Sequence, residues 1–218
     1  MKSTANLIES LVTDVKPVRR LRSPVLRAAC WLLFAALMLA LVAVGHGVRP
    51  DLMFKLRQPV FATGVAAALI TAVLAAVASF IASIPGLSRR WLLLPIPALA
   101  VWVSTIGYGC LTNWVSIGPE GMSLGETARC FVTLVVTSIP LSLAMLIMLR
   151  YVARLSPTPV VMTGSLAVAA MTASALSLFH PLDATIMILI SNFGVTALFL
   201  ALSKRYGERL FARVTPQE

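Results

Sequence analysis

The stretch VFATGVAAALITAVLAAVASFIASI at residues 60–84 contains no charged residue, and PGLSRR follows it at residues 85–90. An α-helix needs about 20 apolar residues to cross the roughly 30 Å hydrocarbon core of a bilayer. The stretch is long enough to do so. Arginines directly after a span are typical of the end that is retained on the cytoplasmic side. The pattern therefore predicts a membrane-spanning helix that ends inside the cell.

Five more apolar runs of similar length surround this one. They cover residues 26–46, 91–111, 128–149, 159–179 and 184–203. The connections are short enough that neighbouring helices are expected to pack antiparallel. The predicted fold class is an all-α integral membrane protein, a six-transmembrane-helix bundle with short loops. Pro140 is expected to kink the fourth span, and Pro95 and Pro97 are expected to disturb the start of the third.

Composition supports a membrane protein. Apolar residues make up 59% of the 218 residues, charged residues 12%, and the mean hydropathy is +0.92. These values are too apolar for a soluble domain of this length. The first run lies too deep in the chain, and is too long, for a secretory signal peptide, so we expect it to remain as the first span.

Basic residues alternate from one side of the predicted bundle to the other. Most of the 18 lysines and arginines fall before residue 28, in 85–90, in 150–158 and after 203. This distribution predicts that both termini are cytoplasmic. The net charge of +10 is explained by this topology and by anionic lipid, so no direct contact with nucleic acid is predicted. Four arginines are interpreted as a clamp on the inner leaflet, and Trp31, Trp91 and Trp114 as interface residues. These arginines are Arg19, Arg20, Arg22 and Arg27.

Catalysis and ion transport lack the residues that they need. No Asp, Glu, Lys or Arg lies near the middle of a predicted span, where proton relays and ion pathways place such groups. The two histidines, His46 and His180, fall at span ends, away from any arrangement of nucleophile and base. We therefore predict that the chain is not an enzyme and holds no cofactor.

The sequence divides into three parts, of which the first is the predicted working part. Residues 1–25 form a cytoplasmic segment, residues 26–203 the transmembrane domain, and residues 204–218 a basic tail. Apolar residues recur in the first part at a spacing of three and four, which predicts an amphipathic helix that Pro17 ends. They are Leu7, Ile8, Leu11, Val12 and Val15. Such a helix could lie on the inner leaflet, cap the bundle, or enter the groove of a cytoplasmic partner.

Short motifs distributed along the chain carry a resemblance to a known family. They are Leu7-Ile8, Leu11, Asp14, Pro17-Val18-Arg19-Arg20-Leu21, Pro24, Val48-Arg49-Pro50-Asp51-Leu52, Pro85-Gly86, Arg89-Arg90, Gly107-Tyr108-Gly109-Cys110, Gly125-Glu126, Arg129-Cys130 and Phe179-His180-Pro181-Leu182-Asp183. Their order and content resemble the NrsF-type family from about residue 5 to about residue 205, over the spans defined above. Members of that family are six-span inner-membrane proteins that act as anti-sigma factors.

The resemblance implies a function and a partner. It implies that the N-terminal segment sequesters an extracytoplasmic-function sigma factor in a bacterium and releases it on a stress outside the inner membrane. The residues assigned to partner binding are Leu7, Ile8, Leu11, Val12, Asp14, Val15, Pro17, Val18, Arg19 and Arg20. Besides the sigma factor, the bilayer is the expected partner, and a homo-oligomer is compatible with the sequence. The alternative functions are a small-solute transporter and a structural subunit of a membrane complex.

Cysteine placement suggests a sensor on the outer side. The predicted topology puts Cys110 and Cys130 at outer span ends, in an oxidising compartment, and Cys30 at an inner end. The first two could pair in response to an oxidant, or could simply pack as small apolar residues. The resemblance implies a further cysteine in the last outer loop, but that loop, residues 179–183, has none.

A sensed metal ion is a weaker hypothesis for the same side. Cys130, His180 and Asp183 carry ligand types that zinc-like ions accept. Their spacing is not that of a compact metal motif. A structural role for His180, and a helix cap by Asp183, fit the sequence better.

Overall fold

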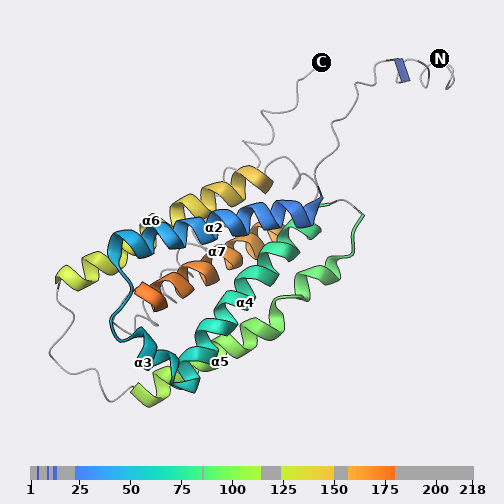
Figure 1. Ribbon diagram of the computed structural model, residues 1–218. Helices are drawn as coiled ribbons and strands as arrows, with labels where there is room; N and C mark the ends of the chain where they lie inside the picture. Colours follow the sequence, from blue (N-terminus) through green and yellow to red (C-terminus); the bar gives the residue numbers. More distant parts are fainter. Residues whose placement is uncertain are drawn as a thin grey trace.

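The computed structural model describes residues 23–84, 86–113, 124–149 and 157–179, together with Thr4, Glu9, Val12 and Thr13. The described residues form helices and their connections (Figure 1). The long helices are α2 (Pro24–His46), α4 (Pro59–Ala82), α5 (Ile96–Asn113), α6 (Leu124–Leu149) and α7 (Pro157–Phe179). Two short ones, α3 (Leu52–Leu56) and the 3-10 helix η1 (Arg89–Leu93), lie in the connections before α4 and α5.

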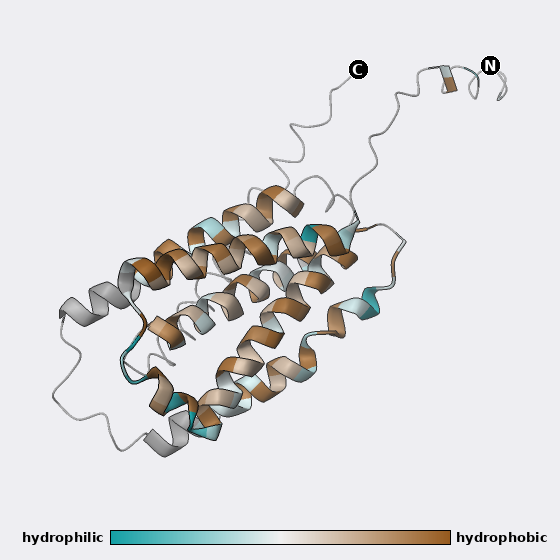
Figure 2. Cartoon of the chain, viewed as in Figure 1, coloured by the Kyte–Doolittle hydropathy of each residue, from teal (hydrophilic) through white to brown (hydrophobic). Residues whose placement is uncertain are grey.

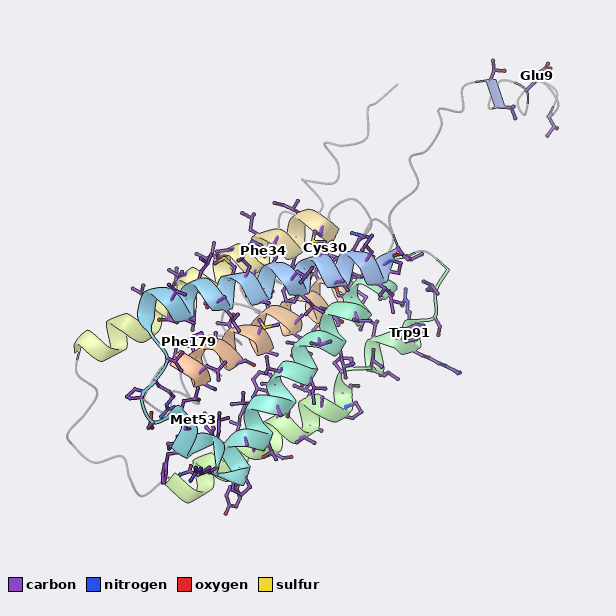
Figure 3. The ribbon with its side chains drawn as sticks, in the orientation of Figure 1. Glu9, Cys30, Phe34, Met53, Trp91 and Phe179 are labelled. Atoms are coloured by element: carbon purple, nitrogen blue, oxygen red, sulfur yellow. The ribbon has the colours of Figure 1, made fainter. Side chains whose placement is uncertain are left out.

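The long helices form one bundle with α4 in a central position. Helix α4 packs against α2, α5 and α7, while α6 packs against α2 and α7 (Figure 1). The starts of α2 and α7 meet the ends of α4 and α6 at what we name the Arg27 end. The opposite end, which holds α3, is named the Arg49 end. In Figure 3, Cys30 and Trp91 lie toward the first end, and Met53 and Phe179 lie toward the second.

Five helical segments are long and apolar enough to cross a membrane. They are Pro24–Gly45, Pro59–Ala82, Arg89–Tyr108, Val132–Leu149 and Pro159–Phe179. Hydrophilic residues gather at helix ends and connections, while apolar residues dominate the helices between them (Figure 2). The all-helical class is confirmed for the described residues, and the first five predicted spans correspond to these five candidate membrane-spanning helices. The sixth predicted span, residues 184–203, lies outside the described residues.

Proline defines where three of these helices begin. Pro24, Pro59 and Pro157 are the first residues of α2, α4 and α7. Proline suits this position because the missing N–H has no partner inside the helix and its φ angle is already helical. Ser23 caps α2, with its side-chain oxygen accepting a hydrogen bond from the Leu26 N–H at 3.4 Å. The predicted limits at residues 26, 60 and 159 were therefore close.

Two helices differ from their predicted limits, for different physical reasons. The third run was predicted to be helical from residue 91, but α5 begins at Ile96 and residues 89–93 form η1. Pro95 and Pro97 account for this break, because neither has an N–H to donate to the carbonyl four residues earlier. In the first turn of α5 the missing N–H has no partner within that helix, so Pro97 is tolerated there. Helix α6 instead begins early, at Leu124. It includes Glu126 and Arg129, since a helix can extend beyond the part of it that is apolar.

Small residues let α4 and α7 approach closely. Alanines 72, 75 and 76 of α4 and 167 and 170 of α7 are buried in one core. A Cβ atom added at Gly164 of α7 would lie 3.3 Å from Ser79 Oγ, Met145 Cγ and Leu149 Cδ1. Close backbone contact of this kind replaces the hydrophobic driving force that lipid cannot supply. The close packing of α4 against α7 therefore depends on these small residues.

Buried hydroxyl groups in the bundle mostly bond to the preceding helical turn. Thr71, Thr137 and Ser174 each donate to the carbonyl four residues earlier, at 2.7 to 2.9 Å. Such bonds satisfy a polar group where no water is available. Among the described residues, Thr172 Oγ1 is the buried side-chain oxygen that has no hydrogen-bond partner. The sequence around Thr172 does not distinguish it from the buried threonines and serines that form such bonds.

Candidate functional site

The N-terminal segment is described at four positions, all of them helical. Thr4, Glu9, Val12 and Thr13 are exposed, and Thr13 Oγ1 donates a hydrogen bond to the Glu9 carbonyl at 2.6 Å. The amphipathic helix predicted for the whole segment stays a prediction, because its other residues lie outside the described part of the chain. Val12, which belongs to the predicted apolar stripe, is 68% exposed. At Val12 the stripe is therefore not covered by the bundle.

Most of the residues predicted to bind a partner lie outside the described residues. They are Leu7, Ile8, Leu11, Asp14, Val15, Pro17, Val18, Arg19 and Arg20. Their assignment stays a prediction from the sequence. The same holds for His180 and Asp183 of the predicted sensing set.

The two predicted sensing cysteines belong to helices. Cys110 lies near the end of α5 and Cys130 near the start of α6. Both helix ends belong to the Arg49 end of the bundle (Figure 1). Their side chains lie outside the described part of the chain, so both the proposed pair and the metal set of Cys130, His180 and Asp183 stay predictions. Within the described residues, no three His, Cys, Asp or Glu side chains gather as a metal site would require.

At the Arg27 end, one guanidinium joins three helices. Arg27 lies in the first turn of α2, and its Nη2 donates a hydrogen bond to the carbonyl of Met148 in the last turn of α6. Its guanidinium carbon lies 5.1 Å from the centroid of the Phe80 ring of α4. Carbonyls in the last turn of a helix have no partner within that helix, so Arg27 satisfies one that would otherwise remain unpaired.

Trp31, one turn further along α2, forms a second link to α6. Its side chain is fully buried, and its Nε1 donates a hydrogen bond to the Leu141 carbonyl at 3.2 Å. The interpretation of Trp31 as an interface residue at headgroup depth is wrong, because the ring lies inside the bundle. Arg27, predicted as part of a lipid clamp, is partly buried, and its guanidinium contacts Met148 and Phe80 of the bundle. Trp91, 43% exposed in η1 (Figure 3), keeps the exposure that an interface position requires.

The Arg49 end contains a buried arginine, which the sequence had not singled out as structural. Arg49 is only 4% exposed, and it forms a two-bond ion pair with Asp51, with both N···O distances 2.7 Å. Its guanidinium carbon lies 5.7 Å from the Phe61 ring centroid at the start of α4. Its backbone N–H donates to the Leu178 carbonyl at the end of α7, at 3.4 Å. The connection between α2 and α4 is thereby fastened to α7.

Acidification is expected to weaken this fastening. The hydrogen bonds from Arg49 lower the pKa of the Asp51 carboxyl below its ordinary value of about 3.9. A group with a lowered folded-state pKa stabilises the fold above the unfolded-state pKa, and this contribution is lost as pH falls through the folded-state value. We therefore expect thermal stability in detergent to fall below about pH 3.9.

The Asp51→Asn variant is the control for this expectation. It cannot titrate at residue 51, so its melting temperature should change less than that of the native chain over the same acidic range. The carboxyl is partly exposed, so the difference should also shrink in high salt. Thermal unfolding at several pH values measures both proteins. If their melting temperatures fall equally at acidic pH, the loss of stability comes from groups other than Asp51.

Two clusters, one around Arg27 and one around Arg49, fix helix ends and do not form a reaction centre. Each places a guanidinium against a backbone carbonyl or a carboxylate and above an aromatic ring. Cation–π and charge-assisted hydrogen bonds of this kind hold elements in register. A backbone carbonyl occurs at every residue, so no sequence pattern could have indicated the pairing of Arg27 with Met148. The one available signal was an arginine placed inside the first apolar turn of a span.

Comparison with known proteins places these features in a family. Residues 11–212 match the family model of NrsF, described as negative regulator of sigma F. The curated proteins and the solved structures contained no match to the chain. The family match covers α2 to α7 and both clusters described above. A family of sigma-factor regulators is not a family of enzymes, which agrees with the prediction from the sequence. The chain belongs to the NrsF family of negative regulators of a sigma factor.

Proposed function

We propose that the chain is a six-span inner-membrane protein that holds an extracytoplasmic-function sigma factor inactive at the cytoplasmic face. In this proposal residues 1–25 bind the sigma factor, and an event at the outer face of the membrane releases it. Family membership carries the proposal, because it establishes negative regulation of a sigma factor. The particular residues, the topology and the type of sigma factor are what the proposal adds.

The distribution of charge supports a cytoplasmic Arg27 end. Arg27, Arg89 and Arg90 belong to this end, and Arg150 and Arg154 follow α6 in the sequence there. At the Arg49 end, Arg49 is paired with Asp51, and Lys55 and Arg57 are the other basic residues described there. Basic residues near span ends are retained on the cytoplasmic side. Residues 1–22, which precede Ser23 at the start of α2, would then be cytoplasmic, where a sigma factor is found.

The N-terminal helix has the character of a helix that binds in a groove. Its predicted apolar stripe includes Val12, and that side chain is 68% exposed. Glu9 and Thr13, from the polar side, are exposed as well. Amphipathic helices of this kind bind partners by inserting an apolar stripe into a groove. A helix meant to lie on anionic lipid would instead carry basic residues on its polar face.

The release event is proposed to act on the ends of α5 and α6 at the outer face. A disulfide between Cys110 and Cys130, or a ligand bound near Cys130, would change how these helix ends are held. A disulfide that closes a loop of this size stabilises one state by about 3 kcal/mol. Moving a two-state protein from 1:99 to 99:1 needs about 5.5 kcal/mol. A second contribution, such as the Pro140 kink in α6, would therefore be needed for complete release.

One substitution tests whether the N-terminal stripe retains the partner. In Leu11→Asp, a carboxylate replaces an apolar side chain at the centre of the predicted contact, and the loss of retention should be at least about tenfold because burying an unpaired charge is costly. The tagged full-length chain is crosslinked in bacterial membranes, and captured proteins are identified and quantified by mass spectrometry. The native chain should capture a sigma factor.

Thr13→Asp is the matched control, because it adds the same charge to the exposed polar side of the same helix. It should retain the sigma factor nearly as well as the native chain. Equal retention by Leu11→Asp and the native chain would remove the stripe from the proposal. Capture of no sigma factor by the native chain would contradict the proposed mechanism of sequestration.

A further inference from the structure

The position of Arg27 within its own helix is electrostatically unfavourable. It lies in the first turn of α2, a turn that contains no acidic residue. The N-terminal end of a helix carries a partial positive charge, so a cation is disfavoured there. The position of Arg27 is therefore explained by an interaction outside α2. The structure shows what that interaction is.

Two other helices supply the compensating charge. Met148, whose carbonyl accepts the hydrogen bond from Arg27, is next to the last residue of α6, and Phe80 lies two residues before the end of α4. The C-terminal end of a helix carries a partial negative charge, which favours a nearby cation. The ring of Phe80, 5.1 Å away, adds a cation–π contact. Arg27 thus joins the start of α2 to the ends of α4 and α6.

Trp31 makes this attachment a two-point contact. Trp31 donates a hydrogen bond to the carbonyl of Leu141, which lies seven residues before Met148 along α6. The contacts of Trp31 and Arg27 with α6 are therefore about 10 Å apart along that helix. Leu141 directly follows Pro140, which lies inside α6 and has no N–H to donate. The part of α6 after the proline is therefore held to α2 near both of its ends. A hinge motion at Pro140 would change the relation of α2 to this part of α6.

We propose that Arg27 is a positioning residue for the sigma-factor-binding segment. It fixes the start of α2 against α4 and α6, and residues 1–22 lead directly into that start through Ser23. The orientation in which the segment meets the sigma factor then depends on the positions of the ends of α4 and α6. When the bond to Met148 breaks, the start of α2 can tilt and the partner is held less well. The functional part of this inference depends on the proposed binding role of residues 1–25.

The first measurement tests the attachment itself, without the partner. Spin labels are placed at Val25→Cys in α2 and Leu93→Cys in η1, both exposed positions, in the full chain without its native cysteines. In lipid nanodiscs, the chain with Arg27 should give one narrow distance distribution. Arg27→Leu should broaden or shift it. Arg27→Gln, which keeps hydrogen-bond donors without the charge, should give an intermediate result.

Arg90→Leu is the matched control at the same end of the bundle, because Arg90 is exposed and its loss removes the same charge. Its distance distribution should stay that of the native chain. Trp31→Phe removes the second hydrogen-bond donor while keeping an aromatic ring, and should broaden the distribution if the two contacts act together. An unchanged, narrow distribution in Arg27→Leu would overturn the inference. If Arg27→Leu fails to fold, Arg27→Gln takes its place, and an unchanged, narrow distribution in that variant would overturn the inference.

The second measurement tests the consequence for the partner. The sigma factor captured by the native chain is titrated against each variant in nanodiscs. Arg27→Leu should weaken its affinity by about tenfold, which corresponds to a coupling of about 1.4 kcal/mol between the attachment of α2 and partner binding. Arg90→Leu should leave the affinity unchanged. A broadened distance with unaltered affinity would overturn the positioning role, and a native chain that binds no sigma factor would overturn the proposed function while leaving the distance result intact.

Discussion

Replacing Trp31 with alanine is expected to lower the free energy of unfolding of the bundle by about 3 kcal/mol, the lower end of the range for such truncations in protein cores. Trp31 is the largest fully buried side chain among the described residues, and it packs in the core that includes Ala28, Ala75 and Leu141. We choose the lower end because lipid, unlike water, does not penalise exposed apolar surface. The loss of packing contacts remains.

Two variants of α2 separate packing from hydrogen bonding. Trp31→Phe keeps a ring in the core but loses the bond to Leu141, so it should cost about 1 kcal/mol. Leu33→Ala truncates a side chain that is 71% exposed on the same helix, and should change stability little. Unfolding in mixed detergent micelles measures all three. A cost for Leu33→Ala as large as that for Trp31→Ala would show that burial inside the bundle does not determine stability here.

The membrane-spanning helices were predictable because the signal for them is long and local. Runs without charged residues gave α2, α4 and α7 within about two residues of their limits, which is the usual uncertainty at helix ends. The limits of α5 and α6 were less accurate. Apolar composition marks the part of a helix that lies in lipid, whereas the helix itself stops at a proline or continues through charged residues such as Glu126.

The features that fasten the helix ends could not be predicted from composition. The charge pattern predicts that Arg27 and Arg49 lie on opposite sides of the membrane, but it does not reveal their partners. Arg27 contacts a carbonyl 121 residues away, and Arg49 contacts a carboxylate two residues away. A short-range pair such as Arg49 with Asp51 could have been proposed from spacing. The contact with Met148 depends on the antiparallel packing of α2 and α6.

The aromatic pattern was misleading for a related reason. Tryptophan near the end of a span is typical of the membrane interface. Trp91 keeps the exposure of such a residue, but Trp31 is buried and bonds to Leu141. A helical period of 3.6 residues decides which side of α2 faces the bundle, and α2 is apolar on all sides. Hydropathy could therefore not distinguish a lipid-facing tryptophan from an interior one.

Replacing Gly164 with leucine is expected to separate α7 from α4 and α6, with a loss of about 3 kcal/mol of stability, the upper end of the usual cost of overpacking. Even a Cβ atom at this position would lie 3.3 Å from atoms of Ser79, Met145 and Leu149. These three side chains come from two different helices, so no single rotamer change relieves the contact. The hydrogen bond from Ser79 Oγ to the Val160 carbonyl, now 3.1 Å, should lengthen as the helices move apart.

Gly107→Leu is the matched control, because Gly107 also lies inside a long helix and a Cβ atom added there would have nothing within 4 Å. Leucine favours the helix more than glycine does, so this variant should be neutral or more stable by up to about 1 kcal/mol. The opposite signs expected for one substitution at two glycines make unfolding in mixed micelles a direct test of the close crossing. If both variants gained stability, the contact of α7 with α4 and α6 would have to be looser than the structure shows. Helix α7 would then not hold the end of α6, which binds Arg27, in its place.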